Sequence, residues 1–98
     1  MAEISITEAD QRRNQSQLLD VREDFEVAEG MIPGALHIPM DELQARLAEL
    51  DPNIPVIAIC RSGNRSARVA DALNVAGFAA DTMDGGMIAW TRAGLPTT

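Results

Sequence analysis

The middle of the sequence contains an unbroken apolar run, residues 56–59, that ends at Cys60. A run without polar alternation is typical of a strand that is buried on both faces in a parallel sheet. After a short polar stretch the apolar positions recur with a helical period, at Val69, Ala70, Leu73 and Ala76. Gly77 then supplies a left-handed stop. The pattern predicts a strand, a loop that begins at Cys60, and a helix that begins at Arg65.

Similar patterns predict the elements in the rest of the chain. We expect further strands at residues 4–6, 17–21, 36–38 and 78–83. We expect further helices at residues 7–13, 23–29, 41–50 and 87–92. Strands that alternate with helices, through connections too long for hairpins, indicate an α/β fold with a mostly parallel, five-stranded sheet and helices on both faces. At this length, residues 1–98 are expected to form a single domain.

Capping and turn residues refine these predictions. Thr7 and Asp10 resemble a capping box at the start of the first helix. Asp41 is a good N-cap for a helix with leucines along one face. Gly63 and Asn64 are residue types that tolerate positive φ, so they suit a tight loop before the next helix.

The charge balance is acidic overall and basic in places. The chain has 15 acidic and 8 basic residues, for a net charge of −7. Because this charge repels nucleic acid and anionic membranes, we expect neither as a partner. Every cation is an arginine, and four of them fall at or near expected loops and helix starts: Arg22, Arg61, Arg65 and Arg68. Local arginines on an acidic protein favour capture of a small anion.

The cysteine count excludes two kinds of small domain. Cys60 is the only cysteine, so no internal disulfide can form, and metal-binding spacings such as C-x-x-C are absent. We therefore expect no metal site. The first residues lack the charged start and apolar core of a signal peptide, and no apolar run approaches membrane-spanning length. The cytoplasm is the expected compartment, since its reducing conditions suit a free thiol.

Cys60 has surroundings that suit a nucleophile. A lone cysteine is most often a small buried hydrophobe, and such a residue needs no special loop after it. Here Gly63, Asn64 and two arginines, Arg61 and Arg65, follow within the next five positions. Successive backbone N–H groups, the positive end of the helix dipole and the arginine charges would each lower the pKa of the cysteine. We therefore interpret Cys60 as a nucleophile.

Three segments together carry a resemblance to a known family. They read, in order, LLDVREDFEVAEGMIPGALHIP, CRSGNRS and DGGMIAW. This combination resembles a single-domain rhodanese, of the thiosulfate sulfurtransferase family, over nearly the whole chain. The resemblance implies a rhodanese fold, an active-site loop that begins at Cys60, and catalysis without a metal or organic cofactor. One departure is Met31, which stands where many relatives have a histidine before Ile-Pro-Gly-Ala.

The resemblance also implies covalent catalysis in two steps. The Cys60 thiolate attacks the outer sulfur of thiosulfate, sulfite leaves, and cyanide or a thiol, small or on a protein, removes the sulfur from the persulfide. We expect the substrate-binding residues to follow the cysteine directly: Arg61, Ser62, Gly63, Asn64 and Arg65. The planar guanidinium groups of Arg61 and Arg65 would hold the sulfonate oxygens.

Residues outside the loop receive supporting roles. Asp20, Arg22 and Ser66 are candidates for holding the loop in place. Asp20 and Arg22 lie where open α/β sheets place their sites, so they either orient the loop or form a solvated ion pair. His37 is expected to be a partly exposed strand residue and not a base, and Trp90 is expected in the core.

Three function classes remain open from the sequence. The first is a sulfurtransferase. The second is a phosphatase or arsenate reductase, because a cysteine–arginine anion loop also serves those reactions. Relatives that handle phosphate carry five residues between cysteine and arginine, whereas Cys60 and Arg65 enclose four. The third is a non-catalytic or carrier module that delivers persulfide sulfur to a protein partner.

Overall fold

The computed structural model describes residues 2–98, and its centre is a five-stranded sheet. The strand order is β1-β5-β4-β2-β3, and all neighbouring strands pair in parallel. The expected α/β fold with a mostly parallel sheet is therefore confirmed, and the sheet is parallel throughout. The strands are β1 (Glu3–Ile4), β2 (Gln17–Asp20), β3 (Leu36–His37), β4 (Val56–Ile59) and β5 (Ala80–Met83).

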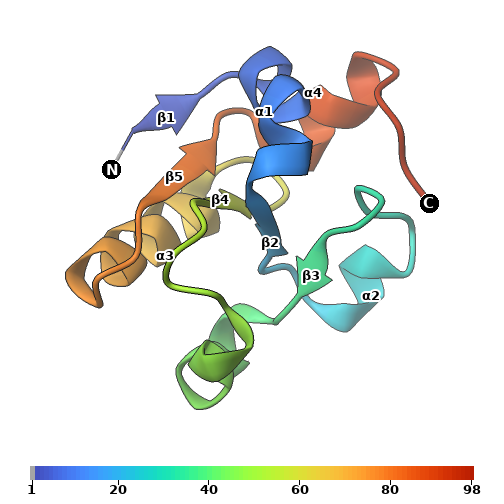
Figure 1. Ribbon diagram of the computed structural model, residues 1–98. Coiled ribbons are helices and arrows are strands. Elements are labelled where there is room, and N and C mark those ends of the chain that lie inside the picture. Colours follow the sequence, from blue (N-terminus) through green and yellow to red (C-terminus); the bar gives the residue numbers. More distant parts are fainter. Residues whose placement is uncertain (1) are drawn as a thin grey trace.

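Helices cover both faces of this sheet. In Figure 1, α1 and α4 lie beside one another, away from α3. Within residues 2–98, no helix has the length and apolar character needed to cross a membrane. The helices are α1 (Ile6–Arg12), α2 (Asp24–Val27), α3 (Asn64–Val75) and α4 (Gly86–Arg92), and the 3-10 segments are η1 (Arg13–Gln15), η2 (Met40–Glu42) and η3 (Gln44–Glu49).

The central strand β4 separates two hydrophobic cores, and all four of its residues are buried. Ala58 and Cys60 belong to the core that contains residues of α3. Ile57 and Ile59 belong to the core formed with α1 and α4, where Trp90 is fully buried as expected. Because successive side chains of a strand point to opposite faces, this alternation directs Cys60 toward α3.

The first helix begins earlier than the sequence pattern predicts. Its N-cap is Ser5, whose Oγ accepts a hydrogen bond from the Glu8 N–H at 3.0 Å. The predicted capping box is therefore wrong, since Thr7 and Asp10 both lie inside α1. The reason is tertiary: β1 pairs with β5 only as far as Ile4, which leaves Ser5 extended and free to cap the helix.

The single helix predicted from Asp41 is wrong, because two 3-10 segments, η2 and η3, take its place. Asp41 lies inside η2 and makes no cap hydrogen bond. The backbone leaves helical geometry at Arg46, with φ −115° and ψ 15°. The Arg46 guanidinium pairs with Glu42 and Glu49 and reaches the His37 carbonyl at 3.3 Å. A helix this short has little stability of its own, so such tertiary contacts decide its form.

Smaller differences concern element boundaries. Helix α3 begins at Asn64 and not at Arg65, because Gly63 adopts the left-handed conformation, with φ 109°, and acts as its N-cap. Among residues 2–98 only glycines have positive φ, so the tolerance expected of Asn64 is not used. Helix α2 is shorter than predicted, and β5 begins at Ala80 instead of Phe78.

Candidate functional site

Cys60 lies at the carboxyl end of the central strand, at the start of the loop that leads into α3. It is buried, with 1% relative exposure. The first turn of α4 packs against this loop. The Met87 N–H donates to the Cys60 carbonyl at 2.9 Å, and the Ile88 N–H donates to the Arg61 carbonyl at 3.1 Å. The segments that follow β4 and β5 therefore meet at the cysteine.

This close approach requires a glycine at the start of α4. Gly86 has a φ of 58°, and a Cβ at this position would collide with the carbonyl groups of Cys60 and Arg61. Glycine fits here because it has no Cβ and adopts positive φ without strain. The segment DGGMIAW thus contributes to the site through its shape, by allowing α4 to lie against the loop.

The Cys60 sulfur is surrounded by hydrogen-bonding groups. The Gly63 N–H donates to Sγ at 3.0 Å, and the Oγ of Ser66 lies 3.3 Å from Sγ. Ser66 is fully buried, and its Oγ also lies 3.2 Å from the Gly63 carbonyl and 2.7 Å from the Oγ1 of Thr82. Since a hydroxyl has one hydrogen, Ser66 can donate to a Cys60 thiolate while Thr82 donates to Ser66.

These contacts lower the pKa of the Cys60 thiol. Burial is the largest single influence and raises the pKa, but it is opposed by the Ser66 hydroxyl and by the backbone N–H groups of Ser66, Gly63 and Ser62. Taken together the hydrogen bonds outweigh burial, and they favour the thiolate. The arginine charges were expected to lower this pKa as well, but the main lowering contributions come from hydrogen bonds.

Thr82 is a functional candidate that the sequence analysis missed. It is buried on β5, where it pairs in register with Ala58 of β4. Threonine is a common residue in strands, so nothing in the local pattern distinguishes it. The packing of α3 against β5 brings its hydroxyl to that of Ser66, and this packing belongs to the tertiary structure.

Asp20 and Arg22 form a buried ion pair at the end of β2. Their relative exposures are 0% and 6%, and the Arg22 guanidinium donates to both oxygens of the Asp20 carboxylate at 2.8 to 3.1 Å. The same guanidinium donates to the carbonyl groups of Gly30 at 2.8 Å and Glu26 at 3.4 Å. The alternative of a solvated pair is therefore wrong. Arg22 fixes α2 and the turn after it against the sheet.

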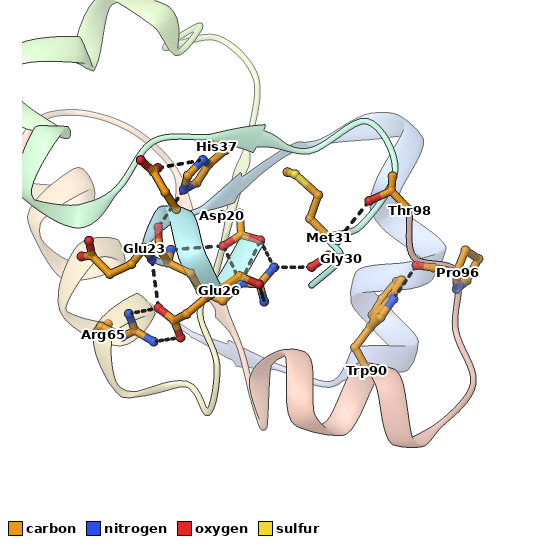
Figure 2. Close-up of polar contacts among 12 residues, drawn as sticks. Asp20, Glu23, Glu26, Gly30, Met31, His37, Arg65, Trp90, Pro96 and Thr98 are labelled. Atoms are coloured by element: carbon orange, nitrogen blue, oxygen red, sulfur yellow. Dashed lines mark hydrogen bonds and ion pairs between the residues drawn. The ribbon is translucent and has the colours of Figure 1, made fainter. Parts of the chain in front are cut away.

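Glu26 joins α2 to the first turn of α3. Two nitrogens of Arg65 donate to its two carboxylate oxygens at 2.7 and 2.8 Å (Figure 2). These hydrogen bonds lower the pKa of Glu26 to about 2, and the carboxylate in turn raises the pKa of Arg65. Arg65 was expected to hold substrate, yet its guanidinium is occupied by Glu26. Glu26 is a second residue of the site that the sequence did not reveal. It forms a capping box with Glu23, so its local pattern indicates only the start of a helix.

A cleft of about 490 Å³ lies beside the loop. Arg61 lines it from the loop, and Ile88 and Arg92 line it from α4. Arg61 is exposed, and neither it nor Arg92 forms an ion pair within residues 2–98. The other polar loop residues, Ser62 and Asn64, are exposed as well. Of the five residues predicted to bind substrate, only Arg61 therefore lines the cleft.

The remaining polar candidate, His37, belongs to β3. Its side chain is half-buried, and its Nε2 lies 2.7 Å from the Arg22 carbonyl oxygen. This agrees with the expected strand residue. Across the part of the chain that the structure describes, no group of three or more His, Cys, Asp or Glu side chains could hold a metal ion.

Comparison with known proteins identifies similar sequences. A family model described as a rhodanese-like domain matches residues 5–93. YtwF of Bacillus subtilis (strain 168), which is named as a candidate sulfurtransferase, is 49% identical over 73 residues, which make up 74% of this chain and 71% of that protein. A sulfurtransferase of Allochromatium vinosum is 41% identical over 80 residues, covering 81% of this chain and 75% of that protein.

The same comparison extends to solved structures. The crystal structure of a rhodanese-related protein from Thermoplasma volcanium matches with a TM-score of 0.95 at 30% sequence identity. The match covers 100% of this chain and 98% of that one. The fold that the sequence resemblance implied is therefore confirmed.

Proposed function

The chain belongs to the rhodanese-like domain family, and from this premise we propose that it is a thiosulfate sulfurtransferase that carries sulfur as a persulfide on Cys60. The names of its relatives support the reaction class. The observation that carries the proposal is the environment of the Cys60 sulfur, with a Gly63 N–H at 3.0 Å, the Ser66 Oγ at 3.3 Å and a lowered thiol pKa. Such surroundings favour the thiolate, which is the form that attacks.

The proposed reaction has two displacement steps. The Cys60 thiolate attacks the outer sulfur of thiosulfate, the sulfur–sulfur bond of thiosulfate breaks, and its electron pair leaves with sulfite. A nucleophile, either cyanide or a thiolate, then attacks the outer sulfur of the persulfide, and the electron pair of that bond returns to Cys60. The reaction consumes no metal or organic cofactor. Its partners are a small anionic donor and a cyanide or thiol acceptor.

The loop residues divide the work of this reaction between them. The backbone N–H groups of Ser62, Gly63 and Ser66, which already lower the pKa of Cys60, would stabilise the thiolate and then the persulfide. Arg61, exposed and without an ion pair among residues 2–98, would hold the sulfonate oxygens. Arg65 would act as a positioning residue, since Glu26 occupies its guanidinium.

Loop size favours sulfur transfer over phosphoryl chemistry. Four residues separate Cys60 from Arg65, and the N–H groups of so short a loop converge near one sulfur atom. Thiosulfate needs to bring only its outer sulfur into this cradle. A phosphate ester would need its phosphorus and three oxygens inside, in line with the thiolate. The guanidinium of Arg65 is also occupied by Glu26, so it is not available to bind those oxygens.

The test is the mass of the intact protein after treatment with thiosulfate. We expect the reduced protein to gain one sulfur atom, cyanide to remove it as thiocyanate, and the Cys60→Ser variant to gain nothing. Arg68→Gln is the control variant and should gain the sulfur atom as the wild type does, since Arg68 is exposed on α3 and does not line the cleft. A mass that does not change, with the thiol confirmed as reduced, would contradict thiosulfate as the donor.

Two other outcomes point to the alternative functions. A persulfide that forms but resists cyanide and small thiols, and is discharged only by a protein thiol, would favour the carrier module. Hydrolysis of an aryl phosphate that is lost in Cys60→Ser, without any thiocyanate formation, would favour a phosphatase. A reducing compartment, with the cytoplasm as the proposed one, suits the free Cys60 thiol in each case.

A further inference from the structure

The hydroxyl groups of Ser66 and Thr82 form a buried pair next to the Cys60 sulfur. The relative exposures of the two residues are 0% and 2%. The Ser66 Oγ lies 3.3 Å from the sulfur, 3.2 Å from the Gly63 carbonyl oxygen and 2.7 Å from the Thr82 Oγ1. Because a hydroxyl carries one hydrogen, Ser66 donates to only one of these three atoms at a time.

Thr82 narrows the choice that Ser66 has. Within residues 2–98, the hydroxyl of Thr82 is hydrogen-bonded to Ser66 alone. If Ser66 donated to Thr82, the hydrogen of Thr82 would be buried without an acceptor, which costs free energy. When Thr82 donates to Ser66 instead, the Ser66 hydrogen is directed to either the sulfur or the Gly63 carbonyl. The bond from Thr82 also polarises the Ser66 hydroxyl, which makes it a stronger donor.

The Gly63 carbonyl can release the Ser66 hydroxyl without losing its last hydrogen bond. It also accepts from the Ala67 N–H at 3.2 Å, in the first turn of α3. It therefore stays paired when Ser66 turns away, as a buried carbonyl must. Since hydrogen bonds to a charged atom are the stronger ones, the charge on the sulfur decides between the two acceptors of Ser66.

We propose that Ser66 and Thr82 form a hydrogen-bond switch that follows the charge on the Cys60 sulfur. Ser66 donates to Sγ when Sγ is a thiolate, and to the Gly63 carbonyl when Sγ is uncharged, as in the thiol or the persulfide. Thr82 is a positioning residue, because it acts on the sulfur only through Ser66. The inference rests on the proposed sulfurtransferase function and assigns the switch a part in its second step, where Cys60 is the leaving group.

The second step places negative charge on Sγ. Cyanide attacks the outer sulfur of the persulfide, the bond between that sulfur and Sγ breaks, and its electron pair returns to Sγ as thiocyanate leaves. A hydroxyl that turns toward Sγ during this step stabilises the developing thiolate and makes Cys60 a better leaving group. The same bond makes the free thiolate a weaker nucleophile in the first step. The switch therefore speeds discharge of the persulfide and slows attack by the thiolate.

The experiment measures the two steps separately in the wild type, Ser66→Ala and Thr82→Val. Loading by thiosulfate is followed by intact mass at about pH 10, where a cysteine is mostly thiolate. Discharge is followed as thiocyanate formed when cyanide is added to the loaded protein, freed of excess thiosulfate. We expect Ser66→Ala to discharge about threefold more slowly and to load up to about threefold faster, as follows from the dependence of such rates on thiol pKa. Thr82→Val should change both rates in the same directions by about twofold.

The opposite signs distinguish the switch from a merely structural role, because a disordered loop would slow both steps. Thr7→Val is the matched control for Thr82→Val, since Thr7 is exposed on α1, and it should leave both rates unchanged. Rates that fall together in the variants would overturn the switch. Discharge at the wild-type rate in Thr82→Val would overturn it as well, while the persulfide itself would still support the proposed function.

A measurement on the free protein keeps the inference testable if thiosulfate does not load Cys60. The carbon-13 resonance of the Gly63 carbonyl is followed by NMR while Cys60 is titrated with base. A carbonyl carbon is deshielded by each hydrogen bond that its oxygen accepts, so the departure of the Ser66 hydroxyl should move this resonance upfield. We expect the upfield change in the wild type to exceed that in Ser66→Ala. Equal changes in the two proteins would overturn the switch whatever the donor proves to be.

Discussion

The two sides of the Cys60 loop are built in opposite ways. On the inner side the sulfur meets the Gly63 N–H and the Ser66 hydroxyl, and Ser66 rests on Thr82. On the outer side Arg61 and Arg92 face a cleft and have no ion pair among residues 2–98. The inner side consists of neutral hydrogen-bonding groups, and the outer side consists of exposed charge.

The sequence suggested that the arginines both stabilise the thiolate and capture the ligand. The difference between the two sides assigns these tasks to different groups. Buried hydrogen bonds act at short range in a site of low dielectric, so they can hold a thiolate independently of the solution. Exposed charges act through solvent and are screened by salt, so they suit the capture of a ligand that must also leave. The comparison predicts that changes on the inner side alter stability and the thiolate, whereas changes on the outer side alter ligand affinity.

The largest effect is expected from closing the space between the loop and α4. Gly86→Ala places a Cβ against the carbonyl groups of Cys60 and Arg61, at a φ of 58°. We expect the free energy of unfolding to fall by about 3 kcal/mol or more, from strain and displacement of the loop together. Urea denaturation at pH 7 measures the loss.

Gly94→Ala is the matched control for this variant. Gly94 also has positive φ, at 74°, but a Cβ there meets nothing within 4 Å. Gly94→Ala should lower the free energy of unfolding by about 1 kcal/mol, because only the backbone conformation becomes less favourable. Equal losses in the two variants would show that contact between α4 and the loop does not require glycine.

The next largest effect concerns the ion pair between Glu26 of α2 and Arg65, which supports the loop. The pKa of Glu26 lies at about 2 in the folded protein, below its ordinary value of 4.5, because Arg65 donates to both of its oxygens. A lowered pKa stabilises the fold above about pH 5, and the contribution is lost as the pH falls toward 2. We expect Glu26→Gln to lower the free energy of unfolding by about 2 kcal/mol at pH 7.

The pH dependence distinguishes this ion pair from simple packing. Urea denaturation of the wild type and Glu26→Gln at pH 7 and pH 3 should show a smaller difference between them at pH 3. Glu29→Gln is the control, since Glu29 is exposed and unpaired within residues 2–98, and it should change stability by less than about 0.5 kcal/mol. A difference that stays constant with pH would assign the loss to packing.

A smaller effect tests the hydrogen bonds to the thiolate directly. Ser66→Ala removes the hydroxyl that lies 3.3 Å from Sγ and helps to lower the pKa of Cys60. The pKa should therefore rise, and the rate of alkylation by iodoacetamide at pH 7 should fall by up to about tenfold. The rate measured against pH gives the midpoint for each variant.

Thr82→Val sharpens this test, because it removes only the partner of Ser66. We expect the rate of alkylation to fall about threefold, since the Ser66 hydroxyl loses the donor that orients it. Thr7→Val, on the exposed surface of α1, is the control. If Thr82→Val matches the wild type while Ser66→Ala does not, Ser66 stabilises the thiolate without help from β5.

The smallest expected effect compares both sides in one protein. Raising the ionic strength from about 0.05 to 0.5 M should raise the apparent KM for thiosulfate about two- to fourfold, because the charges around the cleft are exposed. The rate of alkylation by uncharged iodoacetamide should change little over the same range. A parallel salt dependence of the two rates would mean that arginine charges, and not hydrogen bonds, hold the thiolate.

The sequence by itself determined the elements with strong patterns and the position of the site. The apolar run of β4, the helical period of α3 and the stop at Gly77 depend on local sequence, so they predicted the central strand and helix correctly. The glycine at position 63 correctly predicted a left-handed residue between this strand and this helix. The order of the segments indicated the parallel sheet, and the three motifs indicated the family.

Only the tertiary structure decided the capping of weak elements and the partners of charged residues. Ser5 caps α1 because β1 pairs with β5 only as far as Ile4. The 3-10 segments after β3 form where Arg46 bonds to the His37 carbonyl. Arg61 and Arg65 were both expected to bind substrate, yet α2 places Glu26 on Arg65, while Arg61 has no ion pair among residues 2–98. Thr82 of β5 reaches Ser66 of α3 because these two elements pack together. Side-chain pairing depends on which elements become neighbours, and no local pattern encodes that.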